Sequence, residues 1–162
     1  MKLGKVFIFV LALLMLGACS QSNAIEIGSD APDFSLPDIN GNKVSLSAFN
    51  GKVIILDFFA SWCPPCKMEI PDFIALEKAY SDKGFAMIGV ALVSAVEARG
   101  FAGKMGINYP VLVDDGKASE IYGPIRSIPT TFIIDKNGKI VKMYIGYREK
   151  AVFESDIKEL LK

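Results

Sequence analysis

The stretch Val53-Ile54-Ile55-Leu56-Asp57-Phe58-Phe59, followed two residues later by Trp62-Cys63-Pro64-Pro65-Cys66, decides the fold of this chain. The first run is almost continuously apolar and rich in β-branched and aromatic residues, which is typical of a strand buried on both faces of a sheet. Proline is favoured at the first position of a helix, and helix-favouring residues then continue to about Tyr80. The sequence therefore predicts a buried strand, a short loop, and a helix with Cys63 at its N-cap and Cys66 about one turn inside.

Two thiols in this position are suited to redox chemistry. The positive end of the helix dipole and the unpaired N–H groups of the first turn favour a thiolate at Cys63, so we expect Cys63 to be the nucleophile. Cys66, three residues on, can then resolve a mixed disulfide. Because Pro65 has no N–H, only Cys66 can donate to the N-cap side chain. We therefore expect a less stabilised thiolate than in strongly oxidising dithiols, and a pair that acts as a reductant.

The same pair could instead hold a structural zinc ion or form an inert buried disulfide. Structural zinc usually takes four Cys or His ligands, and this chain has no His and only one further cysteine, Cys19. Spacing alone does not exclude the inert disulfide. A strand, a two-residue loop and a helix start around the pair favour the redox interpretation over it.

Further apolar runs place the other elements around this centre. We expect a β-hairpin at 31–46, strands at 52–59, 85–93, 109–113, 130–135 and 139–145, and helices at 65–80, 95–105, 117–122 and 149–161. Asn137-Gly138 is a strong hairpin signal, and Pro71 should kink the first helix. Strands that alternate with helices and end in a hairpin predict an α/β fold with a central mixed β-sheet flanked by helices on both faces.

The N-terminal sequence is typical of an export signal. Lys2 and Lys5 precede a short apolar run, and Leu16-Gly17-Ala18-Cys19 resembles a bacterial lipoprotein signal in which the cysteine is lipidated. We expect residues 1–18 to be a signal peptide, 19–30 a lipid-anchored tether and 31–162 one domain. Cleavage without lipidation of Cys19 remains open, and an uncleaved anchor is the further alternative.

Charge and cysteine content narrow the function classes. The chain has 18 basic and 18 acidic residues, and removal of residues 1–18 takes away two lysines and no acids. No basic patch points to nucleic acid. An exported protein with one usable cysteine pair is not a disulfide-stapled scaffold, which leaves the pair free for catalysis.

Two widely separated motifs carry a family resemblance. The runs from Asp57 to Pro71 and from Ser127 to Phe132 (Ser-Ile-Pro-Thr-Thr-Phe) together resemble the thioredoxin superfamily over residues 27–162. The Ala-Pro-Asp-Phe start and the Cys-Lys-Met-Glu-Ile-Pro run are most similar to its membrane-anchored, TlpA/ResA-like branch of extracytoplasmic thiol-disulfide oxidoreductases, with an AhpC/TSA-related N-terminal part. This resemblance implies a thioredoxin-like fold with an added N-terminal β-hairpin.

The resemblance also implies roles for particular residues. It implies a cis peptide bond before Pro129, which then faces the dithiol, whereas an ordinary trans loop proline is the alternative. The Ile128 backbone would pair with an extended substrate, and Trp62 and Pro64 would contact it. Phe59 and Gly146 match places in the family's substrate groove, but a core or turn role remains equally open for them.

Asp57 is the candidate proton carrier. A carboxyl inside an apolar strand should have a pKa raised by desolvation, so it could accept and return the proton of Cys66. The alternative is an aspartate that faces solvent at a strand edge. Asp57 matches an aspartate of thioredoxin, and many membrane-anchored relatives lack it.

The expected function is that of an enzyme, a lipid-anchored protein-disulfide reductase. Its substrates would be disulfides in exported proteins such as apocytochrome c, and a membrane-embedded dithiol donor would supply electrons without a cofactor or metal. We expect a monomer on the periplasmic side of the membrane. The alternatives are a peroxiredoxin-type peroxidase, disfavoured because Leu56 and Ala60 stand where that pattern has Pro and Thr, and a non-enzymatic chaperone or metal-delivery module.

Overall fold

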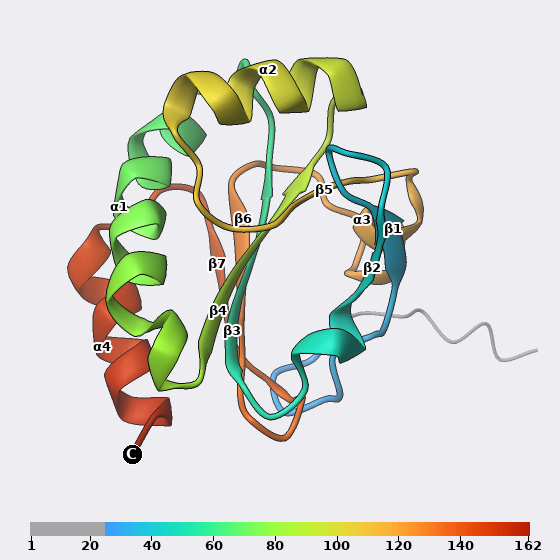
Figure 1. The fold of residues 1–162 in the computed structure, drawn as a ribbon. Coiled ribbons are helices and arrows are strands. Elements are labelled where there is room, and N and C mark those ends of the chain that lie inside the picture. The colour runs from blue at the N-terminus through green and yellow to red at the C-terminus, as the bar shows by residue number, and fades with distance from the viewer. Residues whose placement is uncertain (1–24) are drawn as a thin grey trace, which may run out of the picture.

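The computed structural model describes residues 25–162 (Figure 1). The predicted signal peptide, Cys19 and the first part of the predicted tether lie outside the described residues. The strands are β1 Ser35–Pro37, β2 Lys43–Ser45, β3 Val53–Phe59, β4 Phe85–Ala91, β5 Val111–Val113, β6 Thr130–Ile134 and β7 Ile140–Ile145. The helices are α1 Pro64–Tyr80, α2 Ala95–Met105, α3 Lys117–Ile121 and α4 Lys150–Leu160, with 3-10 turns at Leu46–Phe49 and Ser81–Lys83.

Five strands form one mixed sheet in the order β5-β4-β3-β6-β7. β3 is parallel to β4 and β4 to β5, whereas β6 is antiparallel to both β3 and β7. β1 and β2 form a separate antiparallel hairpin. The structure thus confirms the predicted mixed sheet with helices and an added N-terminal hairpin.

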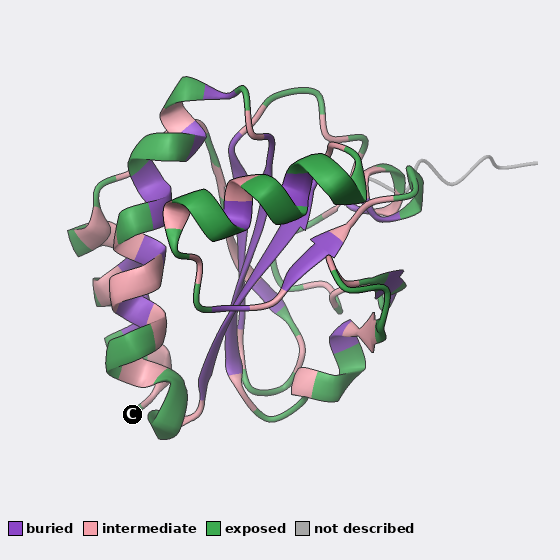
Figure 2. Cartoon of the chain, turned by 45° about the horizontal axis from the view of Figure 1, so that its top comes forward, coloured by how far each residue is buried: buried purple, intermediate pink, exposed green. Residues whose placement is uncertain are grey.

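Alternation along β3 builds two cores, because successive side chains of a strand point to opposite faces. Val53, Ile55 and Phe59 pack with α1, α2 and α4 on what we call the first face. Ile54, Leu56 and Phe58 pack with the hairpin and α3 on the second face. Figure 1 shows α1 and α4 on one side of the sheet and the hairpin with α3 on the other, and in Figure 2 the central strands are buried.

The element boundaries differ from the predicted ones by a few residues. The strand predicted at 85–93 ends at Ala91, because Ser94 starts α2 by accepting a hydrogen bond from the Glu97 N–H on its Oγ. β5 begins only at Val111, after Pro110. α1 begins at Pro64, one residue earlier than predicted, and includes Pro71 within one helix. None of these differences moves a residue from one face of the sheet to the other.

An N-terminal arm, residues 25–31, runs along the outer edge of β7. Gly28 N–H donates to the Ile140 carbonyl at 2.7 Å, and Ile140 N–H donates to the Ser29 carbonyl at 2.9 Å. Asp30 pairs antiparallel with Lys139. The arm therefore covers the edge of the sheet only where β7 begins. Within residues 25–162, no helix has the length and apolar character needed to cross a membrane.

Candidate active site

The cysteine pair lies where β3 passes into α1, and its local geometry is the predicted one. Cys63 is the N-cap in an extended conformation and Pro64 is the first helical residue. The Cys66 N–H donates to Cys63 Sγ at 3.3 Å. Cys63 and Cys66 are joined by a disulfide with a Cα–Cα distance of 5.3 Å, and both are buried. The structure therefore describes the oxidised form of the pair.

A second loop, 65 residues further along the chain, meets the pair. The Ile128–Pro129 peptide bond is cis, as the resemblance implied. The Ile128 carbonyl oxygen lies 3.7 Å from Cys63 Sγ. Thr130 Oγ1 donates to the Ser127 carbonyl at 2.7 Å, and Gly146 N–H donates to the Pro129 carbonyl at 2.8 Å. These bonds hold the loop against the ends of β6 and β7, and so fix the position of Ile128 beside the cysteines.

The remaining substrate-contact candidates separate into exposed and buried ones. Trp62, beside the nucleophile candidate, has 65% of its surface exposed, whereas Phe59 has 1%. Phe59 is therefore a core residue. Gly146 has a φ of 77° at the turn after β7, a conformation that favours glycine. Of the two positions left open, Phe59 has a core role and Gly146 a turn role.

Asp57 is buried on the first face of the sheet, so it does not face solvent. Thr131 of the neighbouring strand β6 is paired with Asp57 in the sheet. It donates a hydrogen bond from Oγ1 to Asp57 Oδ1 at 3.0 Å. Burial raises the pKa of Asp57 well above its usual range, and the nearby Glu69 charge raises it further, against the smaller effect of the Thr131 bond. Burial inside an apolar strand thus raises the pKa of Asp57, which is the direction expected from the sequence.

Glu69 of α1 is a second buried carboxyl that the sequence analysis missed. Its side chain is fully buried, and Oε1 accepts the Arg148 N–H at 2.5 Å, while Oε2 has no hydrogen-bond partner within residues 25–162. Burial raises its pKa to about 7, against the opposing effect of Arg148. A signal was present: Cys66, Glu69, Ile70 and Phe73 follow the spacing of one buried helix face.

Ser61, one residue before Trp62, donates a hydrogen bond from its Oγ to Glu97 at the start of α2. The loop that leads to the cysteines is therefore tied to α2 as well as to β3. Across residues 25–162, no group of three or more His, Cys, Asp or Glu side chains is arranged to hold a metal ion. The described site brings together the two cysteines and the two buried carboxyls of Asp57 and Glu69.

Comparison with known proteins identifies the class of protein to which this chain belongs. The AhpC/TSA family profile matches residues 27–143. The thiol-disulfide oxidoreductase ResA of Bacillus thuringiensis (strain Al Hakam) is 32% identical over 99% of each chain. ResA of Bacillus subtilis (strain 168) is 37% identical over 76% of this chain and 69% of that one. A solved thiol:disulfide interchange protein from Chlorobium tepidum TLS, 33% identical, matches 86% of this chain and all of its own with a TM-score of 0.78.

The fold, the buried Cys-Pro-Pro-Cys pair and the cis-proline loop beside it define a thioredoxin-like thiol-disulfide oxidoreductase. The chain belongs to the AhpC/TSA family within the thioredoxin superfamily, and in it to the ResA-like proteins.

Proposed function

We propose that this oxidoreductase works as a reductase of disulfide bonds in exported polypeptides such as apocytochrome c. The observation that carries this proposal is the start of α1, where Cys63 Sγ accepts the Cys66 N–H and faces the Ile128 carbonyl. Prolines occupy the first two helical positions and can donate no further N–H to it. The Cys63 thiolate is then less stabilised than in strongly oxidising pairs, and a less stabilised dithiol gives up electrons more readily.

The reaction proceeds in two exchanges. The Cys63 thiolate attacks one sulfur of the substrate disulfide, so a mixed disulfide forms and the other substrate sulfur leaves as a thiolate, which takes up a proton. Cys66, as a thiolate, then attacks Cys63 Sγ, and the second substrate sulfur leaves in the same way. Two electrons pass from the protein dithiol to the substrate, and the protein ends as the Cys63–Cys66 disulfide.

Asp57 is the proposed proton acceptor for Cys66. The nucleophilic form of Cys66 is the thiolate, so its proton must leave before the second exchange. Asp57 lies on the same face of the sheet as the pair, and its raised pKa suits a group that takes up and releases a proton near neutral pH. Glu69 shares this buried region and, when ionised, makes Asp57 a stronger base by raising its pKa.

Substrate positioning is assigned to the surface around Cys63. The Ile128 backbone beside Pro129 is the element with which an extended substrate segment would pair. Trp62 offers an exposed aromatic surface next to the nucleophile, and Pro64 adds an apolar contact at the helix start. Pro129 is proposed to keep metal ions away from the two thiols.

The cellular setting of the proposal comes from the sequence. Residues 1–18 read as a signal peptide and Cys19 as a lipidation site, so we propose an anchored protein on the periplasmic side of the membrane. A membrane-embedded dithiol protein would regenerate the reduced pair by the same exchange chemistry. The domain is proposed to act as a monomer.

The test is the direction of electron flow. The reduced protein is mixed with an oxidised apocytochrome c peptide, the free thiols are alkylated, and both chains are weighed by mass spectrometry. We expect alkylated peptide cysteines and an unalkylated Cys63–Cys66 pair. Cys63→Ser should leave the peptide oxidised, and Cys66→Ser should accumulate a mixed disulfide through Cys63. A peptide that stays oxidised beside a reduced wild-type protein would contradict the proposal.

A further inference from the structure

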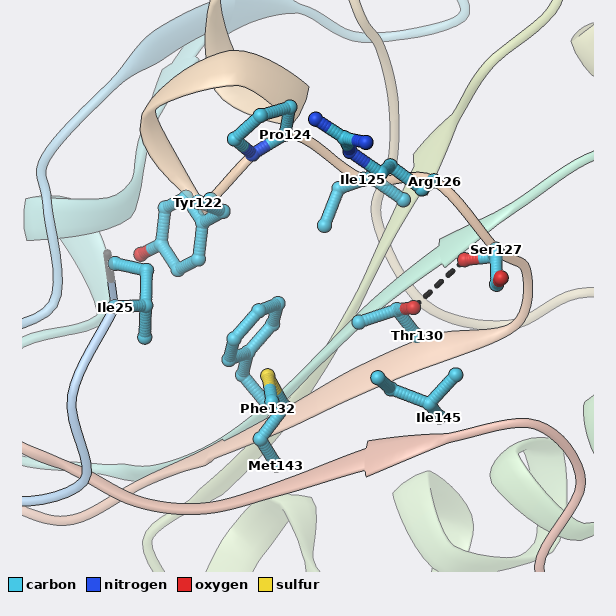
Figure 3. Close-up of a pocket in the computed structure, with 11 residues that line it drawn as sticks. Ile25, Tyr122, Pro124, Ile125, Arg126, Ser127, Thr130, Phe132, Met143 and Ile145 are labelled. Carbon is cyan, nitrogen blue, oxygen red and sulfur yellow. Dashed lines mark hydrogen bonds between the residues drawn. The ribbon is translucent and has the colours of Figure 1, made fainter. Parts of the chain in front are cut away.

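An apolar groove on the second face of the sheet opens beside the cis-proline loop (Figure 3). Its volume is about 520 Å³. Phe132 of β6 and Met143 and Ile145 of β7 form its floor, residues 122–127 form its roof, and Ile25 of the arm closes the far end. The groove was not foreseen from the sequence.

Two of the three floor residues, Met143 and Ile145, are exposed although they are apolar. The exposed fractions are 41% for Met143 and 54% for Ile145, which places them among the few exposed large apolar side chains of the described residues. They lie side by side with β6 residues in register, Met143 beside Phe132 and Ile145 beside Thr130. An exposed apolar patch in a hollow is a common mark of a site that another molecule covers.

Among residues 25–162, no segment pairs with the backbone edge next to this floor. Gly146 N–H bonds inward to Pro129, so the alternation of an antiparallel ladder turns the backbone groups of Ile145 and Met143 outward. Within residues 25–162, the arm pairs with the outer edge only up to Ile140. An open edge beside an apolar hollow is suited to an added extended strand that sets a side chain into the hollow.

The groove adjoins the cis-proline loop of the redox site. Ser127 and Thr130, two of its lining residues, stand on either side of the Ile128–Pro129 bond. Ile128 in turn contacts Cys63 Sγ through its carbonyl oxygen. The groove therefore begins at the loop that holds Ile128 beside Cys63, and Ile25 closes the other end.

We propose that this groove holds an apolar side chain of the polypeptide whose disulfide is reduced, with that segment extended along the free edge of β7. This inference rests on the proposed function and names the substrate class more closely. Phe132 lies four positions after Ile128, which is about 14 Å of strand, so the apolar side chain should stand roughly four positions from the reacting cysteine.

The positive charge of Arg126 at the roof of the groove indicates that the bound segment carries an acidic residue. Arg126 is exposed, and within the described part of the chain no carboxylate pairs with it. An acidic residue near the apolar one would complement this charge. The chain's own residues 20–24, Ser-Gln-Ser-Asn-Ala, are polar and do not match an apolar floor. A substrate segment with an apolar residue beside an acidic one would match both the floor and the charge.

The experiment compares two disulfide peptides that differ only in a leucine or a serine four residues from the reacting cysteine. Their reaction with the reduced protein is followed by the fluorescence of Trp62, the only tryptophan. We expect the leucine peptide to react about tenfold faster, because an open groove buries a leucine side chain only in part. Met143→Ser should reduce this preference to below about twofold.

Three comparisons serve as controls. Ile27→Ser changes another exposed apolar residue, which belongs to the arm and does not line the groove, and this variant should keep the preference. Glutathione disulfide, which is too small to reach the groove, should react equally with all variants. Arg126→Gln should slow a peptide that carries glutamate beside the leucine by roughly threefold at low salt only.

The outcomes separate the two proposals. A normal reaction with glutathione disulfide without any leucine preference, or a preference that survives Met143→Ser, would overturn the groove proposal alone. No reaction with either disulfide peptide or with glutathione disulfide would overturn the proposed function and this inference with it. A dimer in sedimentation that Met143→Ser dissociates would assign the groove to a second copy of the chain and also overturn the proposal.

Discussion

The two faces of the central sheet bury the same kind of apolar side chain but differ in their ionisable groups. The first face, under α1 and α4, contains the cysteines and the buried carboxyls of Asp57, Glu69 and Asp156. Among residues 25–162, the second face has no buried carboxyl, and its centre is the aromatic group of Phe58, Tyr122 and Phe132.

This difference indicates that neighbouring residues of one strand have different roles. Asp57 and Phe58 are neighbours in β3, yet their side chains enter different cores. A buried carboxyl costs stability unless it is paired or protonated. Under the proposed mechanism the first face bears that cost because the reaction needs a proton carrier, whereas the interior of the second face is packed with apolar and aromatic side chains that contribute to stability.

The largest expected effect belongs to the second face. Phe58→Ala removes a fully buried ring that contacts Tyr122 and Phe132, and should lower the free energy of unfolding by about 3–5 kcal/mol. The reduction potential of the variant, measured under conditions where it is folded, should equal that of the wild type. Urea unfolding and redox titration check the two parts. A changed potential would show that the faces are not independent.

The next effect is the pH dependence that Glu69 contributes to stability. Its pKa is raised from 4.5 to about 7 in the folded protein, so between these values the folded state binds more protons than the unfolded one. Stability should therefore fall as pH rises from about 4.5 to about 7, by up to roughly 3 kcal/mol, and change little from this cause above that range.

Glu69→Gln tests this dependence, because glutamine keeps the shape and cannot ionise. Urea unfolding at a series of pH values should show a flatter profile for the variant, with a gain in stability at neutral pH. Glu159→Gln, an exposed change on α4, is the matched control and should keep the wild-type slope. Equal slopes for Glu69→Gln and wild type would mean that Glu69 does not carry a raised pKa.

The smallest of the three effects is kinetic. Asp57→Asn keeps the Thr131 contact in shape but removes the proton acceptor, so release of substrate from the mixed disulfide should slow by roughly a hundredfold near pH 7. The loss should shrink at higher pH, where a thiol ionises without help. Rapid acid quench and mass spectrometry measure the mixed disulfide. A rate that is unchanged at pH 7 would remove Asp57 from the mechanism.

Much of this arrangement could be predicted from the sequence, since it depends on local patterns. The apolar run of β3, the proline at the first position of α1 and the Cys63 N-cap are all short-range features, and the structure shows each of them. Burial of Asp57 followed from its place inside an apolar strand. The cis bond before Pro129 was implied only by resemblance, because an X-Pro bond has no local signal for it.

The features that were missed depend on contacts between distant segments. Glu69 looks like an ordinary helix glutamate until α1 is packed on the sheet and Arg148, 79 residues later, approaches it. The groove is formed by the arm, the loop after α3 and two edge strands, none of which is unusual by itself. Even so, the spacing of Glu69 with the apolar residues of α1 predicts that its side chain lies on the buried face of that helix.

The reduction potential of the Cys63–Cys66 pair tests the central claim most directly, because it fixes whether this pair gives or takes electrons. The protein is equilibrated in graded thiol–disulfide buffers, and the oxidised fraction is read from alkylation. We expect a two-electron couple near that of thioredoxin, about −270 mV, as the prolines at the start of α1 imply. A potential near about −120 mV, that of a strong oxidant, would contradict a reductase.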